Sequence, residues 1–205
     1  MLPRVTEVRK VPKAVIFLFC GNGIRLAVYP SNLFVRCPRC GGPRALSKAP
    51  SPFVCADCGL RYYFNPSVAV AAFIQRSDGR WLFIRRAKEP SKGLLSVAGG
   101  FVEIGEKAEA ALAREVFEEI GVGVQDLRFL ESQPNQYDYL GVTYPVLDLY
   151  FLARTIGNPH CAQPEEVAGI EWRLPSEIRL EDLAFQSLRA AWTNHDFTFF
   201  TFQAI

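Results

Sequence analysis

Two apolar runs just past residue 65 give the clearest secondary-structure signal along the chain. Ser67–Gln75 (SVAVAAFIQ) is almost entirely apolar, and Trp81–Ile84 follows it after Ser77-Asp78-Gly79. Short apolar runs bounded by turn residues are typical of buried strands, and an Asp-Gly dipeptide between two such runs favours a hairpin turn. We therefore expect a pair of buried strands joined by that turn.

A helical repeat extends from Glu106 to Ile120. Gly121 follows at the position where helices commonly end, because glycine enters the left-handed conformation without a steric penalty. The pattern predicts a helix over Glu106–Ile120 with its acidic residues away from the apolar face. The apolar positions are Ala110, Leu112, Ala113, Val116, Phe117 and Ile120.

Further strands and a second helical region are predicted after this helix. Phe197–Phe202 alternates aromatic residues with Thr, which favours an edge strand or a docking tail. Strands and two helices in mixed order are typical of an α/β or α+β sandwich. The expected strands are Arg128–Glu131, Val142–Ala153 and Val167–Trp172, and the expected helices are a short one opened by Pro175-Ser176 and a longer one over Glu181–Asn194.

The N-terminal residues have two interpretations. Basic residues precede the apolar run Ala14–Cys20, as they do in a short signal peptide. The turn residues Gly21-Asn22-Gly23 between Ala14–Phe19 and Ile24–Tyr29 instead favour a β-hairpin. We prefer the hairpin because the turn chemistry fits it.

The overall composition limits the classes of function. The 205 residues are 49% hydrophobic and 21% charged, with a formal net charge of +2. This composition supports a packed core and carries too little net charge to predict nucleic-acid binding. Since no apolar run reaches the roughly 18 residues that a membrane span needs, we expect a cytoplasmic protein without a membrane partner.

Four of the six cysteines form two CxxC pairs, Cys37–Cys40 and Cys55–Cys58. Two such pairs separated by a short segment are typical of a structural Zn²⁺ site with four thiolate ligands, and thiolates require a reducing compartment. A redox CxxC motif is the alternative, but it would not explain two matched pairs. The basic residues around the pairs leave a nucleic-acid contact open as a less favoured role.

Three glutamates in the predicted helix suggest a second metal site. Glu115, Glu118 and Glu119 stand at positions i, i+3 and i+4, which share one helical face. The next turn, Gly121–Val124, supplies no basic partner, so divalent cations are the natural neutralisers of these carboxylates. The pattern predicts a site for Mg²⁺ or Mn²⁺ rather than a solvated acidic face.

The segment from Gly100 to Val122 resembles the signature of the Nudix hydrolases, Gly-x5-Glu-x7-Arg-Glu-U-x-Glu-Glu-x-Gly-U, where U is a bulky aliphatic residue. The resemblance implies an α/β Nudix fold, an α/β/α sandwich with a mixed sheet, preceded here by a small zinc ribbon. It also implies metal-dependent pyrophosphate hydrolysis. The matching residues are Gly100, Glu106, Arg114, Glu115, Val116, Glu118, Glu119, Gly121 and Val122.

The same resemblance assigns roles within this segment. It implies that Glu115, Glu119 and the carbonyl of Gly99 are direct metal ligands and that Glu118 is a further ligand. Arg114 is placed to hold Glu106 or a neighbouring carboxylate through a bidentate contact. One of the glutamates is expected to act as the general base. The expected catalytic residues are Glu106, Arg114, Glu115, Glu118 and Glu119.

A zinc ribbon in front of this signature is similar to the NADH pyrophosphatase branch, and the likeness extends from Cys37 to Trp172. It implies nucleobase stacking by Tyr63 and Phe101, a late metal ligand at Glu166, and a homodimer. Alternatively, Tyr63 and Phe101 pack the seam between two domains. The alternative for Glu166 is an acidic residue in a solvated loop. The expected domains are an N-terminal hairpin segment (1–35), a zinc ribbon (36–64) and a Nudix catalytic domain (65–205).

One segment departs from the NADH pyrophosphatase pattern. The family continues Ser-Gln-Pro with Trp-Pro-Phe-Pro, whereas Ser132-Gln133-Pro134 is followed here by Asn135-Gln136-Tyr137. Gln133 is retained as an expected substrate contact, and Tyr137 or Tyr139 could replace the missing aromatic residues. ADP-ribose, NAD(H) and related dinucleotides are therefore the expected small-molecule substrates, with a capped RNA end left open.

Two other functions compete with this interpretation. The first is a nucleoside triphosphate pyrophosphohydrolase, which would release pyrophosphate. The second is a non-catalytic nucleotide- or RNA-binding regulator. The complete acidic set argues against the regulator, because a pure binder does not need Arg114, Glu115, Glu118 and Glu119 together.

Overall fold

The computed structural model describes residues 16–18, 25–46 and 52–198. The chain divides into two compact units, which we treat separately. The N-terminal unit comprises Met1–Asn65 together with Asp138–Tyr144. The main unit comprises Pro66–Tyr137 and Pro145–Ile205.

Two β-sheets form the centre of the main unit. The four-stranded sheet has the order β8-β5-β10-β9, in which β5 pairs parallel to β10 and antiparallel to β8. The three-stranded sheet has the order β11-β6-β7 and is antiparallel. The strands are β5 (Ser67–Ile74), β6 (Trp81–Arg86), β7 (Leu95–Ser96), β8 (Ala98–Phe101), β9 (Gly123–Tyr139), β10 (Val142–Ile156) and β11 (Val167–Arg173).

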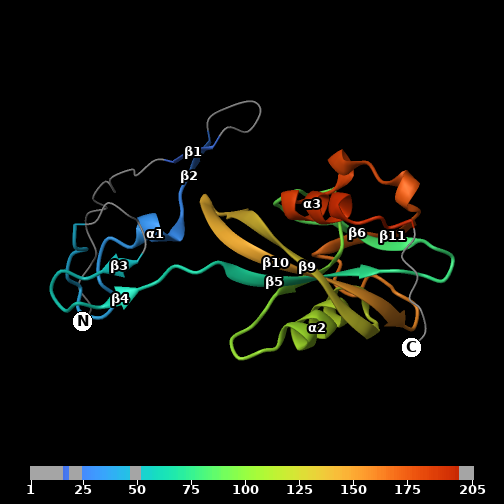
Figure 1. Cartoon of the computed structure of the whole chain (residues 1–205), viewed down its shortest axis with the longest axis horizontal. Coiled ribbons are helices and arrows are strands. Elements are labelled where there is room, and N and C mark those ends of the chain that lie inside the picture. Colours follow the sequence, from blue (N-terminus) through green and yellow to red (C-terminus); the bar gives the residue numbers. More distant parts are fainter. Residues whose placement is uncertain (1–15, 19–24, 47–51, 199–205) are drawn as a thin grey trace. The chain divides into compact units, whose positions relative to one another are not determined.

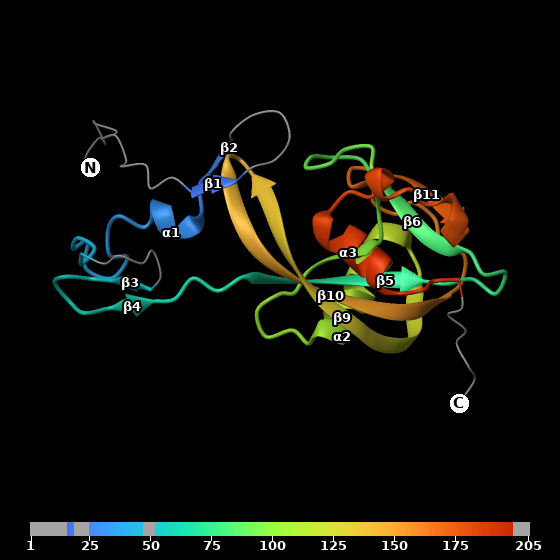
Figure 2. The same ribbon diagram turned by 45° about the horizontal axis from the view of Figure 1, so that its top comes forward.

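Two helices, α2 (Ala108–Ile120) and α3 (Gln186–Asn194), cover opposite faces of these sheets (Figure 1). Strand residues alternate between the two apolar layers, as the period of two in a strand requires. In β5, Ile74 belongs to the layer under α2, whereas Phe73 belongs to the layer under α3. The turned view shows the same layers (Figure 2). The expected α/β/α sandwich with a mixed sheet is confirmed.

Helix α2 packs its apolar face against the apolar residues of the strands beneath it. Its buried apolar residues are Ala111, Leu112, Val116 and Ile120. The helix begins two residues later than predicted and ends as predicted, since Gly121 has a φ of +68° and its N–H donates to the Phe117 carbonyl. The placement of Ala110 and Phe117 on the apolar face was wrong, because Ala110 is exposed and Phe117 is 63% exposed. Glu119, an acidic residue expected away from that face, is buried.

The prediction that β5 and β6 form a hairpin was wrong in its pairing. Both strands exist and Gly79 has a φ of +83°, but beyond a single bridge between Gln75 and Trp81 they join different sheets. Both edges of β5 pair with other strands, β10 on one side and β8 on the other, so neither edge is left for β6.

The later elements differ from the predictions mainly in length. Strand β9 is much longer than Arg128–Glu131. The residues Pro175–Glu177 and Leu180–Asp182 form 3-10 helices, η1 and η2. Helix α3 starts at Gln186, because Leu183 and Ala184 are buried in extended chain before it. Phe197 is buried and stacks on Trp192 with ring centroids 4.2 Å apart, while the residues of the predicted tail from 199 onward lie outside the described part.

The N-terminal unit contains short elements. Strands β1 (Ile16–Leu18) and β2 (Arg25–Ala27) pair antiparallel, which confirms the hairpin strands, while its turn and Cys20 lie outside the described residues. A one-turn helix, α1 (Pro30–Leu33), precedes the antiparallel pair β3 (Phe53–Val54) and β4 (Arg61–Tyr62). Among the helices of the described residues, none is both long and apolar enough to cross a membrane.

Candidate active site and metal centres

Strand β8 and helix α2 meet closely where the glycine pair stands. A Cβ atom at Gly100 would lie 2.6 Å from Oε1 of Glu115, so a larger residue there would displace that carboxylate. Gly99 has a φ of +151°, and a Cβ there would lie 2.7 Å from the Cα of Ala71. The two glycines thus let the backbone of β8 approach both α2 and β5.

Glu119 is a buried carboxylate at the centre of the site. Its residue is 6% exposed, and its Oε2 accepts a hydrogen bond from the Gly99 N–H at 2.9 Å. Burial raises the pKa of Glu119 to about 8, the Gly99 N–H opposes that shift, and the charges of Glu115 and Glu166 add to it. Crowded carboxylates of this kind favour protonation or a bound cation.

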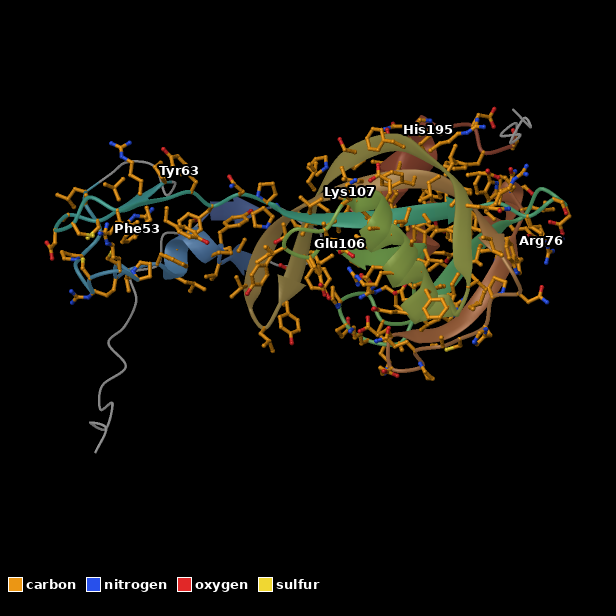
Figure 3. All side chains as sticks on the ribbon, turned by 90° about the horizontal axis from the view of Figure 1, so that it is seen from below. Phe53, Tyr63, Arg76, Glu106, Lys107 and His195 are labelled. Carbon is orange, nitrogen blue, oxygen red and sulfur yellow. The ribbon has the colours of Figure 1, made fainter. Side chains whose placement is uncertain are left out.

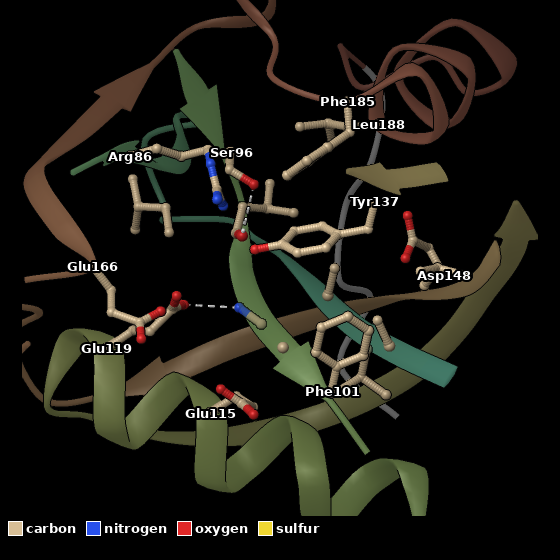
Figure 4. Close-up of a pocket in the computed structure, with 18 of the residues that line it drawn as sticks. Arg86, Ser96, Phe101, Glu115, Glu119, Tyr137, Asp148, Glu166, Phe185 and Leu188 are labelled. Carbon is tan, nitrogen blue, oxygen red and sulfur yellow. Dashed lines mark hydrogen bonds between the residues drawn. The ribbon is translucent and has the colours of Figure 1, made fainter. Parts of the chain in front are cut away.

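Glu115 and Glu166 complete this acidic cluster, which we define as Glu115, Glu119 and Glu166. Burial raises the pKa of Glu115, Arg114 opposes that rise, and nearby acidic charges including Glu166 reinforce it. Figure 4 shows Glu166, from the segment before β11, pointing toward Glu119 of α2. Glu166 also forms an ion pair with Lys88.

Arg114 holds the start of the helix and the preceding loop together. Its Nε and Nη2 atoms donate to the two carboxylate oxygens of Glu106 at 3.0 and 2.9 Å, which is the bidentate contact expected for Arg114 with Glu106 or a neighbouring carboxylate. Nη2 also donates to the Phe101 carbonyl at 3.0 Å, and Nη1 donates to Glu115 at 2.8 Å. Figure 3 shows Glu106 just before α2.

Arg114 also corrects one expectation from the sequence. Its guanidinium lies 3.6 Å from a carboxylate oxygen of Glu118 and contacts Glu115, so these two glutamates do have a basic partner one turn or less away. The Arg114 guanidinium, with the Glu103 N–H, lowers the pKa of Glu106. Arg114 contacts Glu106, Glu115 and Glu118. Of the four glutamates that match the Nudix signature, Glu119 is therefore the one whose charge most needs a cation.

A cavity of about 420 Å³ opens beside the acidic cluster. Glu106 and Arg114 are not among its described lining residues. The predicted residues that line it are Gly99, Phe101, Glu115, Glu118, Glu119 and Glu166. Gln133 is not among its described lining residues, although Asn135 and Tyr137 of the same strand are. The Phe101 and Tyr137 rings meet edge to face with centroids 5.7 Å apart. Tyr63 belongs to the N-terminal unit and is 60% exposed.

Several lining residues were missed by the sequence analysis. They include Arg86, whose guanidinium lies 4.8 Å from the centroid of the Phe185 ring, and Asp148, a buried acid in β10. A signal for Asp148 existed, since a charged residue interrupts the apolar run from Val146 to Leu152. Nothing local signalled Arg86, because it follows Arg85 at the end of an ordinary apolar strand.

The four paired cysteines converge in the N-terminal unit. Their sulfur atoms all lie within 4.8 Å of one another, with Cys40 and Cys55 at 3.5 Å and Cys37 and Cys58 at 3.7 Å. A zinc tetrahedron with bonds of about 2.3 Å has edges of about 3.8 Å. The N–H groups of Arg39 and Cys58 point at Cys37 and Cys55 sulfurs at 3.4 Å, as suits thiolates. The cluster therefore fits a zinc ion.

The acidic cluster also fits the divalent cations that the sequence implies. Hard cations prefer carboxylate and carbonyl oxygens, and the cluster supplies three carboxylates beside the cavity. Gly100 leaves room for the Glu115 carboxylate, and the raised pKa values of Glu115 and Glu119 report negative charge that a cation would offset.

Comparison with known proteins agrees with this geometry. A family model described as NUDIX domain matches residues 65–193. The match covers more than half of the chain and includes both sheets of the main unit, helix α2, helix α3 up to its last residue, and the acidic cluster. The chain belongs to the Nudix family.

Individual relatives extend this result. A protein described as NAD-capped RNA hydrolase NudC from Edwardsiella ictaluri (strain 93-146) is 33% identical over 165 residues, covering 78% of this chain and 60% of that protein. A NUDIX hydrolase from Nitrosomonas europaea has the same fold, with a TM-score of 0.57, 23% identity, and coverage of 76% of this chain and 86% of its own. A MutT NUDIX hydrolase from Burkholderia pseudomallei is similar with a TM-score of 0.52 and 28% identity, and the match covers 63% of this chain and 97% of that one. The chain thus spans 60% of the length of the NudC relative.

Proposed function

We propose that the chain hydrolyses the pyrophosphate bond of nucleoside diphosphate-X compounds and releases nucleoside monophosphate and X-phosphate, with Mg²⁺ or Mn²⁺ as cofactor. The substrates are NAD(H)-type dinucleotides and ADP-ribose. The observation that carries the proposal is the acidic cluster at one end of a nucleotide-sized cavity. The description of the relative as an NAD-capped RNA hydrolase supports an NAD-type substrate and adds the capped end of an RNA to the same class.

The residues of the chain divide the work of this reaction. Bound divalent cations would neutralise the diphosphate charge and acidify the attacking water. Glu115, Glu119 and Glu166, with the Gly99 carbonyl and Glu118, would hold those cations. Because Arg114 ties Glu106 and the Phe101 carbonyl to α2, it fixes the loop that leads into the helix. One glutamate of the set accepts the proton of the water.

The experiment is a product assay with a substitution at the centre of the cluster. The wild-type protein is given NADH, NAD, ADP-ribose and nucleoside triphosphates with Mg²⁺ or Mn²⁺. Glu119→Gln should lower turnover at least ~10²-fold, because it removes a charge that stabilises the transition state. Glu109→Gln, an exposed acid in the first turn of α2, is the matched control and should keep full activity.

Each contrary outcome of this assay identifies a rival. Release of inorganic pyrophosphate from triphosphates alone would indicate the nucleoside triphosphate pyrophosphohydrolase. Nucleotide binding without any product would indicate the regulator. Normal turnover by Glu119→Gln would remove Glu119 from the reaction.

A structural zinc ion in the N-terminal unit is the second part of the proposal. The inter-sulfur distances support it, and the small apolar cluster around Phe53 supports a stapling role for the ion. Stable zinc thiolates need a reducing environment, which is the reason for proposing a cytoplasmic location.

A homodimer is the third part. It rests on the resemblance to NADH pyrophosphatases. The candidate contact surfaces are the aromatic tail Phe197–Phe202 and the N-terminal hairpin. Within the tail, Phe197 is buried in the core of the main unit and is not available for a contact between chains. Light scattering at micromolar concentration should give the mass of two chains, and the mass of one chain would contradict the proposal.

A further inference from the structure

A second buried carboxylate lies in the cavity, on the side away from the acidic cluster (Figure 4). Asp148 of β10 is only 8% exposed and lines the cavity. Its Oδ2 atom accepts hydrogen bonds from Asn135 Nδ2 at 2.8 Å and from Ser187 Oγ at 2.5 Å. The hydroxyl of Tyr150 donates to Ser187 Oγ at 3.0 Å. Residues of β9, β10 and α3 therefore fix the orientation of one acid.

The surroundings of Asp148 leave its charge only partly compensated. Burial raises the pKa of Asp148, and hydrogen bonds from Ser187, Asn135 and Tyr150 oppose that rise. These donors are neutral hydroxyls and a neutral amide, with no positive charge among them, and a buried carboxylate is costly unless it is paired. A donor on a ligand in the cavity would supply a further hydrogen bond to a group that is already oriented to receive it.

The walls around Asp148 suit a flat ring. Phe101 and Tyr137 meet edge to face, and the Tyr137 ring lies 6.4 Å from the Phe185 ring between centroids. Leu188 and Val146 add apolar surface. Apolar and aromatic walls with one fixed acceptor fit a heterocycle with an N–H group better than a sugar, whose hydroxyls need several polar partners.

We propose that Asp148 determines specificity by accepting a hydrogen bond from an amino group on a planar heterocycle of the substrate, and that Asn135 and Ser187 position it. This inference rests on the proposed function, in which that group is the amino group of adenine or the carboxamide of nicotinamide. Both present the same chemistry, an N–H donor on a flat ring. The test below distinguishes the two sources.

The test compares NAD with two analogues, one with hypoxanthine in place of adenine and one with nicotinic acid in place of nicotinamide. The wild-type protein should prefer NAD over one analogue by about 10- to 100-fold in kcat/KM, the range of a hydrogen bond to a charged group. The disfavoured analogue identifies the ring that Asp148 contacts. Asp148→Asn should abolish or reverse this preference, because the new amide can donate to a carbonyl oxygen.

Two further variants keep the test decisive. Glu131→Gln alters another partly buried acid, which contacts Asn194 and is not among the described lining residues, and it should keep the wild-type preference. Ser187→Ala removes one positioning donor and should weaken the preference several-fold, and it serves if Asp148→Asn does not fold. Equal use of all three compounds by the wild type, or an equal loss on all three in Asp148→Asn, would overturn the inference.

Failure of the proposed function would give a different result. If the wild type hydrolyses none of the three compounds with either cation, the proposed function is wrong. The inference is then decided by equilibrium binding of AMP against IMP, and of nicotinamide mononucleotide against its nicotinate analogue. Tighter binding of one amino-bearing member by the wild type, lost in Asp148→Asn, would support it. Equal or undetectable binding within both pairs would overturn it.

Discussion

The two units of the chain bury their interiors by different means. The main unit has two extended apolar layers, one under α2 and one under α3. The apolar cluster of the N-terminal unit is much smaller, with Phe53 enclosed by Cys37 and Cys55, which also belong to the four-sulfur cluster. A small interior rarely stabilises a fold without metals or disulfides. We therefore expect apolar burial to stabilise the main unit and the proposed zinc ion to stabilise the N-terminal unit.

Of the changes considered, removal of the proposed zinc site should have the largest effect on stability, and that effect should be confined to the N-terminal unit. Cys55→Ser, or chelation of the wild type, should unfold the N-terminal unit, since structural zinc contributes its binding free energy to folding. The main unit should stay folded. Hydrogen–deuterium exchange resolved along the chain checks this, with Cys161→Ser as the matched control. Unchanged protection around Phe53 in Cys55→Ser would show that the small cluster is sufficient without metal.

A substitution that opens a void in the core of the main unit tests how much apolar burial stabilises that unit. Leu112 is fully buried between α2 and the sheets. Leu112→Ala should lower the free energy of unfolding of the main unit by about 2–5 kcal/mol. Denaturant unfolding followed by tryptophan fluorescence measures the change, because Trp81 and Trp192 both lie in this unit. A loss below about 1 kcal/mol would mean that the layer under α2 contributes little.

The acidic cluster should oppose the stability of the unit that contains it. The pKa of Glu119 rises from 4.5 to about 8 on folding, so the folded state binds more protons than the unfolded state between these values. Stability of the metal-free protein should then fall as the pH rises through this window. Thermal unfolding in chelator at several pH values measures the slope, which Glu119→Gln should reduce. A stability that rises from pH 5 to 8 in both proteins would contradict this.

The smallest expected effect concerns substrate choice. The segment Asn135-Gln136-Tyr137 lacks the aromatic core of the NADH pyrophosphatases, and an aromatic wall favours flat, weakly polar rings. If the ring at Asp148 is adenine, the kcat/KM for NADH and for ADP-ribose should therefore differ little, or favour ADP-ribose. A preference for NADH of 10-fold or more, about 1.4 kcal/mol, would show that Tyr137 fully restores the missing wall.

Local patterns predicted those features that depend on neighbouring residues in the sequence. The helix and its end at Gly121 follow from helical spacing and from the glycine that ends it. The pairing of Arg114 with Glu106, which lies in the loop before the helix, was expected from the resemblance to the Nudix signature. The pairing of β5 did not follow from local patterns, because turn residues specify a reversal but not which sheet the next strand joins. The two edges of β5 pair with β8 and with β10, a strand that begins some 75 residues later. Likewise, Asn135, Asp148 and Ser187 meet only after three separate elements fold together.

The long hairpin of β9 and β10 contributes residues to both units, so the chain crosses between them more than once. The chain passes between the units after Asn65, after Tyr137 and after Tyr144. The returning segment is hydrogen-bonded within the N-terminal unit, since the Thr143 N–H donates to the Val28 carbonyl at 2.9 Å. A fragment of residues 1–65 would therefore lack the segment 138–144 of its own unit. A fragment starting at residue 66 would carry that segment without the unit it belongs to. Dissection of this protein into autonomous pieces requires a graft of residues 138–144 rather than one cleavage.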